Sequence, residues 1–117
     1  MLVVCVVNDL TVCADNPDYS GLNVSVGESV ELRCNTSLTS DMMWTYDNDG
    51  DSYVDYVYWK GDIASDKPRL SVKSSTAGVH SLVITNTKLR DSGYYDCYDG
   101  HGMRKIGYEV AGMKSIF

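Results

Sequence analysis

Apolar and polar residues alternate with a period of two in several stretches of this chain. Side chains of a β-strand point alternately to its two faces, so this pattern indicates strands buried on one face. No window of about twelve residues has the apolar spacing of an amphipathic helix, and clusters of Gly, Asn, Asp and Ser separate the alternating stretches. We therefore predict one all-β domain of antiparallel sheet. The clearest alternations are Val30, Leu32, Cys34; Leu82, Ile84; and Ile106, Tyr108, Val110.

Size and charge exclude several classes of protein. The 117 residues fit one domain, and the 44% hydrophobic content is that of a globular chain rather than a disordered one. A formal net charge of −6 argues against nucleic acid as a partner, because binding phosphates requires a basic surface. The longest apolar run, residues 2–7, is far shorter than the roughly 20 residues of a membrane span. We therefore expect no direct membrane insertion by this segment.

Residues with catalytic or metal-binding potential are sparse. Four cysteines without a Cys-x-x-Cys motif and two histidines leave little for a zinc site. We find no Ser/His/Asp set, no Gly-rich phosphate loop and no carboxylate pair with a reason to be buried. The run Asp47-Asn48-Asp49-Gly50-Asp51 suggests calcium, but its spacing departs from that of an EF-hand loop, and a solvated turn is the favoured interpretation. We predict that the chain is not an enzyme and takes no cofactor.

One stretch near the C-terminus resembles a known family. In Asp91-Ser92-Gly93-Tyr94-Tyr95-Asp96-Cys97, the residues Asp, Gly, Tyr and Cys stand at alternate positions. Upstream, the run from Gly27 to Cys34 has the pattern of a turn and a strand, and Trp44 follows ten residues after Cys34. Together these residues resemble the immunoglobulin superfamily over about residues 20–117. The resemblance implies a two-sheet antiparallel Greek-key sandwich.

The resemblance assigns roles to several residues. It implies a disulfide between Cys34 and Cys97, with Trp44 packed on the bridge and Leu89 closing the bottom of the core. It also implies that the Tyr95 hydroxyl hydrogen-bonds back to the backbone, the device called a tyrosine corner. A bridge that closes a 63-residue loop contributes roughly 4 kcal/mol in the chain-entropy model.

Two spacings are similar to those of the variable-type (V-set) subclass. The separation of 63 positions from Cys34 to Cys97 leaves room for two additional strands, and Arg69 precedes Asp91 by 22 residues. In V-set domains an Arg and an Asp at about this separation form a salt bridge at one end of the barrel. The last strand lacks the Phe-Gly-x-Gly run of antigen receptors, which argues against antibody-style chain pairing.

The N-terminal residues 1–14 have two interpretations. They are either the remnant of a secretion signal cleaved before Asp15 or an extra N-terminal strand, in which Cys5 and Cys13 lie close enough to form a second disulfide. In both cases we expect residues 15–117 to form a single immunoglobulin V-like domain.

Two glycosylation sequons, Asn23-Val24-Ser25 and Asn35-Thr36-Ser37, agree with a disulfide-bonded extracellular chain. By strand parity we expect Asn23 and Asn35 to point away from the core. We also expect their glycans to cover the ABED sheet and to leave the opposite sheet bare. The predicted localisation is the cell surface or the secreted fraction.

A partner is expected to bind the sheet formed by strands G, F, C and C′ of the resembled fold (the GFCC′ sheet). Interfaces are enriched in Tyr and Trp, which supply a large contact area at low rotamer cost. On strand F, Tyr95 and Cys97 are expected to point inward. Their neighbours Tyr94, Asp96 and Tyr98 are therefore expected to face outward. The predicted partner-binding residues are Tyr94, Asp96, Tyr98, His101, Arg104, Lys105, Tyr56 and Tyr58.

Charge on this face suggests self-association. The basic residues His101, Arg104 and Lys105 lie in and after the F–G turn, and acidic residues gather around the C–C′ turn. Two such ends are complementary to each other under a two-fold axis, although two solvated loops would give the same sequence. The acidic residues are Asp47, Asp49, Asp51 and Asp55.

The sequence therefore predicts an extracellular recognition module in adhesion or immune recognition, whose partner is a protein ligand or a second copy. Two alternatives stay open at this point. One is a secreted decoy or immunomodulator that binds a host ligand. The other is a carbohydrate-binding domain, which would require its aromatic rings to line a groove.

Overall fold

The computed structural model describes residues 18–36, 42–48, 54–59, 62–64, 67–75 and 78–113. Residues 1–14, including Cys5 and Cys13, and the acidic positions Asp49 and Asp51 lie outside this part. The described elements are β1 (Ser20–Ser25), β2 (Val30–Leu32), β3 (Met43–Asp47), β4 (Val54–Trp59), β5 (Asp62–Ile63), β6 (Leu70–Ser74), β7 (His80–Ile84), the 3₁₀ turn η2 (Leu89–Asp91), β8 (Gly93–Tyr98) and β9 (Arg104–Met113).

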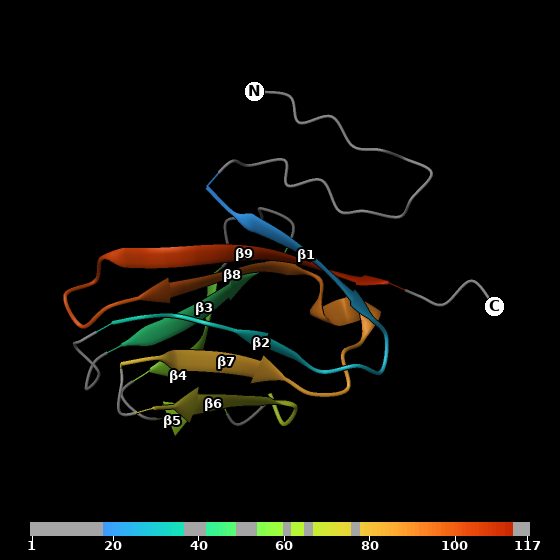
Figure 1. The fold of residues 1–117 in the computed structure, drawn as a ribbon, viewed down its shortest axis with the longest axis horizontal. Helices are drawn as coiled ribbons and strands as arrows, with labels where there is room; N and C mark the ends of the chain where they lie inside the picture. The colour runs from blue at the N-terminus through green and yellow to red at the C-terminus, as the bar shows by residue number, and fades with distance from the viewer. Residues whose placement is uncertain are drawn as a thin grey trace.

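The strands form two sheets that pack face to face (Figure 1). The larger sheet has the order β1-β9-β8-β3-β4-β5, and the smaller sheet has the order β2-β7-β6. All the described pairs are antiparallel except β1 with β9, which run parallel. The predicted two-sheet sandwich is therefore confirmed, with one parallel edge pair that strand alternation alone does not reveal.

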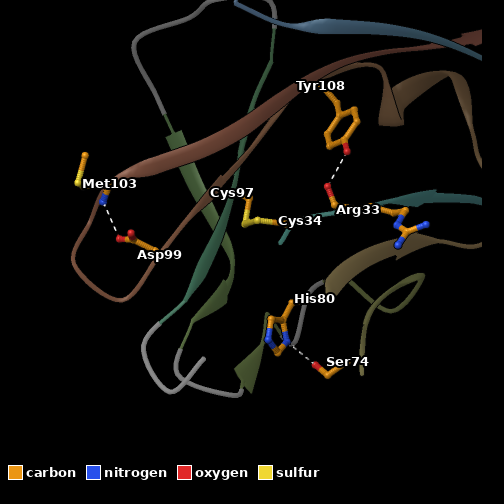
Figure 2. The surroundings of a disulfide bond; sticks show 8 residues. All are labelled: Arg33, Cys34, Ser74, His80, Cys97, Asp99, Met103 and Tyr108. Carbon is orange, nitrogen blue, oxygen red and sulfur yellow. Dashed lines mark hydrogen bonds between the residues drawn. A yellow bond between two sulfur atoms is a disulfide. The ribbon is translucent and has the colours of Figure 1, made fainter. Parts of the chain in front are cut away.

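The core lies between the sheets around a disulfide. Cys34 and Cys97 form the bridge that the resemblance implies, with an S–S distance of 2.06 Å. Trp44 on β3 is completely buried, and its ring stacks on that of Tyr108 at a centroid distance of 6.3 Å. The Tyr108 hydroxyl donates a hydrogen bond to the Arg33 carbonyl oxygen across the gap between β9 and β2 (Figure 2). The disulfide and this hydrogen bond link the two sheets.

Leu89 does not close the bottom of the core, so this prediction was wrong. Its side chain is 52% exposed, while Thr87, two residues earlier, is fully buried. Thr87 is held by backbone hydrogen bonds to Gly27 and Glu28 in the turn between β1 and β2. At Leu89 the chain enters η2, and it is the Leu89 backbone, not its side chain, that lies against Gly112 of β9.

Two sets of hydrogen bonds close the end of the sandwich at which η2 lies. The Tyr95 hydroxyl donates to the Asp91 carbonyl oxygen at 2.6 Å, which is the tyrosine corner. The Asp91 carboxylate accepts hydrogen bonds from both terminal nitrogens of Arg69, including Nη2 at 2.8 Å, and from the Lys88 N–H at 2.7 Å. Gly93, at the start of β8, has a φ of 149°, and a Cβ there would lie 2.8 Å from the Asp47 carbonyl oxygen. Only glycine fits this close approach.

Candidate functional site

The predicted partner-binding residues gather on the outer face of the larger sheet. Residues directly opposite each other on neighbouring antiparallel strands point to the same face. Met43 of β3 lies opposite Tyr98 of β8 and opposite Trp59 of β4. These three side chains therefore form a row across the middle strands of the sheet, on the side that faces away from Trp44.

A β-bulge decides which aromatic residues of β4 reach this face. The register between β3 and β4 shifts between Trp44 and Thr45, so Tyr56 pairs with Thr45 while Tyr58 pairs with Trp44. A bulge places two consecutive residues on one side of the strand. Val57 is fully buried, and Tyr58 packs against the core beside it. The prediction that Tyr58 faces a partner was therefore wrong, and Trp59 takes the outward position.

Tyr56 and Trp59 are the exposed large side chains that β4 contributes to this face. Their exposed fractions are 61% and 50%, and their rings stack at a centroid distance of 6.0 Å with an interplanar angle of 26°. Met43 and Tyr98 beside them are half-buried. We call Met43, Tyr56, Trp59 and Tyr98 the aromatic patch. It is preformed, because stacking and strand pairing hold its side chains.

The neighbouring part of the face, over β8 and β9, is covered by the chain's own side chains. Asp96 is only 6% exposed. Its carboxylate accepts hydrogen bonds from Arg104 Nε at 2.6 Å and from the Tyr19 hydroxyl at 2.9 Å. The Arg104 guanidinium lies 4.6 Å from the centroid of the Tyr19 ring. We call Tyr19, Asp96 and Arg104 the Asp96 cluster. The prediction that Asp96 is available to a partner was wrong, although it does point out of the core.

The Asp96 cluster shifts the pKa of its members and packs closely on the sheet. Burial and the hydrogen bond to Asp96 raise the pKa of Tyr19 to about 12. Burial lowers the pKa of Arg104, but its hydrogen bonds and charge interactions with Asp96 and Tyr19 together outweigh this effect, and the net shift is upward. Beneath the cluster is Gly107 of β9, where a Cβ would lie 2.6 Å from the Tyr19 ring and 2.7 Å from Asp96 Oδ1. Glycine is therefore required for the cluster to pack on the sheet.

Tyr19 also contacts Tyr94, at a ring-centroid distance of 4.8 Å in an edge-on arrangement. The sequence reasoning missed Tyr19 because it precedes β1 and is 77 residues away from Asp96. A tyrosine in that position carries no pattern that predicts this contact.

The tip between β8 and β9 is held by Asp99. Its carboxylate accepts the backbone N–H groups of His101 and Met103, each at 2.9 Å, and these bonds lower its pKa. Figure 2 shows the bond to Met103. The side chains of His101, Met103 and Lys105 are exposed, and Met103 is 67% exposed. Because Arg104 is paired with Asp96, the basic end of the face carries less free charge than the sequence suggests.

Comparison with known proteins now decides the family. The sequence profile of the immunoglobulin V-set domain matches residues 17–114. The chain belongs to the immunoglobulin V-set family. In the lettering of V-set domains, the outer face described above lies on strands G (β9), F (β8), C (β3) and C′ (β4).

Two solved structures show the same fold. The first, a ZIG-8–RIG-5 IG1–IG1 heterodimer, has a TM-score of 0.62 and 19% sequence identity, covering 86% of this chain and 87% of that one. The second, the ZIG-8 IG1 homodimer, has a TM-score of 0.62 and 18% identity, covering 90% of this chain and 88% of that one. The comparison with curated protein sequences returns no match.

Both sequon asparagines of this V-set domain are exposed, but they lie on different parts of it. Asn23 is on β1, opposite Ala111 of β9, and therefore belongs to the larger sheet. Asn35 follows β2 and forms a β-bridge with Val79, beside the smaller sheet. The expectation that both glycans cover the ABED sheet was therefore wrong for Asn23, because β1 pairs with strand G rather than with strand B.

Two other properties bear on the chemistry of the described residues. Within them, no three His, Cys, Asp or Glu side chains gather where a metal ion could bind. Among the same residues there is no helix of the length and apolarity required to cross a bilayer.

Proposed function

We propose that this V-set domain is an extracellular protein-recognition module that binds its partner through the aromatic patch on the GFCC′ face. The observation that carries the proposal is the stacked pair of Tyr56 and Trp59, each at least half-exposed, beside Met43 and Tyr98. Aromatic side chains that are rigid before binding lose little entropy on binding, which is why they dominate interface energetics.

Several features support a protein rather than a carbohydrate as the partner. The patch lies on a sheet surface, and its members do not line the three pockets formed by the described residues that have a volume of about 240–340 Å³. Two solved structures with the same fold are a homodimer and a heterodimer of IG1 domains. A second copy of this chain is therefore the first partner to test.

The Asp96 cluster bears on which interactions supply the affinity for the partner. Since Arg104 is neutralised within the chain, we propose that aromatic burial, rather than pairing of opposite charges, supplies most of the affinity. Exposed charges are screened by salt, whereas apolar burial is not. Self-association through the patch should therefore depend only weakly on salt concentration.

Sedimentation of the oxidised domain across micromolar concentrations, at two salt concentrations, tests the proposal. We expect a monomer–dimer equilibrium that Trp59→Ala weakens at least about tenfold. Leu89→Ser is the matched control, because Leu89 is equally exposed (52% against 50%) and lies outside the patch. A dimer that resists Trp59→Ala would contradict the proposed face.

A strictly monomeric domain would exclude self-recognition and leave a heterologous protein. In that case the domain is tetramerised on a carrier and its binding to cells is measured. Protein recognition predicts that binding is lost after protease treatment of the cells and persists after removal of their glycans. The opposite result would favour the carbohydrate-binding alternative.

A further inference from the structure

A pocket on the side of the sandwich remains outside the proposed binding face. It has a volume of ≈ 310 Å³ and is lined by Arg33, Asn35, Lys105, Ile106 and Tyr108. This volume is at the lower end of the range for small-molecule sites, about 300–1,000 Å³. The lining residues come from the segment that follows β2 and from the first half of β9, up to Tyr108, where β1 begins to pair with β9. One of its lining residues, Asn35, is the acceptor of a glycosylation sequon.

We propose that the first sugar of an N-linked glycan on Asn35 occupies this pocket. In the modification, C1 of an N-acetylglucosamine passes from a lipid-linked pyrophosphate donor to Nδ2 of Asn35. The amide loses one proton and the lipid pyrophosphate leaves. The sugar is then attached to the wall of the pocket by a covalent bond, so its occupant does not have to be captured from solution. This inference does not depend on the protein-binding face.

The backbone around Asn35 holds the attachment point in place. Asn35 forms a β-bridge with Val79, and its two neighbours are hydrogen-bonded across the same gap. The Cys34 carbonyl oxygen accepts the N–H of His80 at 2.7 Å, and the Thr36 N–H donates to Gly78 at 2.9 Å. Cys34 is also half of the disulfide (Figure 2). A sugar on Asn35 is therefore attached to a rigid part of the chain.

The lining of the pocket suits a sugar ring. Ile106 and Tyr108 are half-buried and supply apolar surface for the face of the ring. The Tyr108 ring is fixed, because its hydroxyl donates to the Arg33 carbonyl oxygen at 2.5 Å and its face stacks on Trp44. Arg33 and Lys105 supply N–H donors for the acetamido carbonyl and hydroxyl oxygens of the sugar. No carboxylate lines this pocket.

The other sequon provides a matched control within the same chain. Asn23 is exposed on β1 and, within the part of the chain that the structure describes, does not line this pocket or the two others of similar size. A glycan on Asn23 therefore has no comparable pocket to occupy. Ser25→Ala and Ser37→Ala each remove one sequon without changing its asparagine, so they yield chains that carry a glycan only on Asn35 or only on Asn23.

The experiment uses both variants secreted from cells that make only oligomannose glycans. Endoglycosidase H trims each glycan to a single N-acetylglucosamine, and intact mass confirms the occupancy. We expect the sugar on Asn35 to raise the melting temperature by about 3 °C over the chain with both sequons removed. We also expect it to slow amide hydrogen exchange over residues 105–108. The sugar on Asn23 should change neither quantity measurably.

Lys105→Ser in the Asn35-glycosylated chain should reduce the gain in melting temperature, because it removes one of the two proposed donors. A secreted chain in which Asn35 carries no glycan overturns the inference. So does a trimmed sugar on Asn35 that leaves both the melting temperature and the exchange of residues 105–108 unchanged.

Discussion

The ion pair between Arg69 and Asp91 should be one of the largest single polar contributions to the stability of this domain. The Asp91 side chain is only 12% exposed and that of Arg69 22%. The carboxylate accepts two hydrogen bonds from Arg69 and one from the Lys88 N–H. In Asp91→Asn, the amide oxygen can still accept the Lys88 bond, but the charged pair is lost and Arg69 is left without its partner. We expect a loss of about 2–3 kcal/mol in the free energy of unfolding.

The pH dependence of this loss provides a second check. Burial raises the pKa of Asp91, but the hydrogen bonds from Arg69 and Lys88 outweigh it, and the net shift is below the usual 3.8. A lowered pKa means that the stabilisation is complete above pH 3.8 and is lost as the pH falls through the pKa of the folded state. The difference between the wild type and Asp91→Asn should therefore shrink below about pH 4.

Urea unfolding followed by tryptophan fluorescence, from neutral pH to pH 2, measures both effects. Asp55→Asn is the matched control, because Asp55 is exposed on β4, and it should change stability by less than about 0.5 kcal/mol. A loss of stability for Asp91→Asn below about 1 kcal/mol at neutral pH, or a loss that stays constant down to pH 2, would show that the ion pair does not stabilise the domain in this way.

Three further substitutions test other parts of the structure. Thr87→Val should stabilise the domain by about 1 kcal/mol in urea unfolding, because the buried hydroxyl has no hydrogen-bond partner within the described residues. A destabilised variant would contradict this prediction. Gly107→Ala should destabilise it by about 1–3 kcal/mol, because a Cβ cannot fit beneath the Asp96 cluster, and an unchanged melting temperature would show that the cluster packs differently. Leu89→Ser should change the free energy of unfolding by less than about 0.5 kcal/mol, because the side chain is 52% exposed. A loss of several kcal/mol would indicate that Leu89 packs in the core.

The fold could be predicted from the sequence because its determinants are local patterns or fixed spacings. Strand alternation identified the all-β class. The pattern of Cys34, Trp44 and Cys97 resembles the immunoglobulin superfamily, and that resemblance implied the disulfide and the buried tryptophan. The same resemblance implied that Arg69 and Asp91, 22 residues apart, form the ion pair that closes one end. Each of these features depends on distances along the chain, which the sequence states directly.

The site was less predictable, because its details depend on irregularities of the sheet. Parity along β4 assigns Tyr56 and Tyr58 to one face, but the bulge opposite Trp44 and Thr45 turns Tyr58 inward and Trp59 outward. Strand parity correctly predicts that Asp96 points out of the core. It does not predict that Tyr19 covers the Asp96 side chain. A contact made by a residue outside the regular strands leaves no periodic signal in the sequence.

Binding of Trp59→Ala, measured beside that of Leu89→Ser, decides whether the aromatic patch is the recognition surface. Sedimentation is the assay if the domain self-associates, and binding of the tetramerised domain to cells is the assay if it does not. We expect a loss of at least about tenfold in affinity for Trp59→Ala and wild-type affinity for Leu89→Ser. Equal binding by both variants, with both folded, would contradict the assignment of the aromatic patch as the recognition surface.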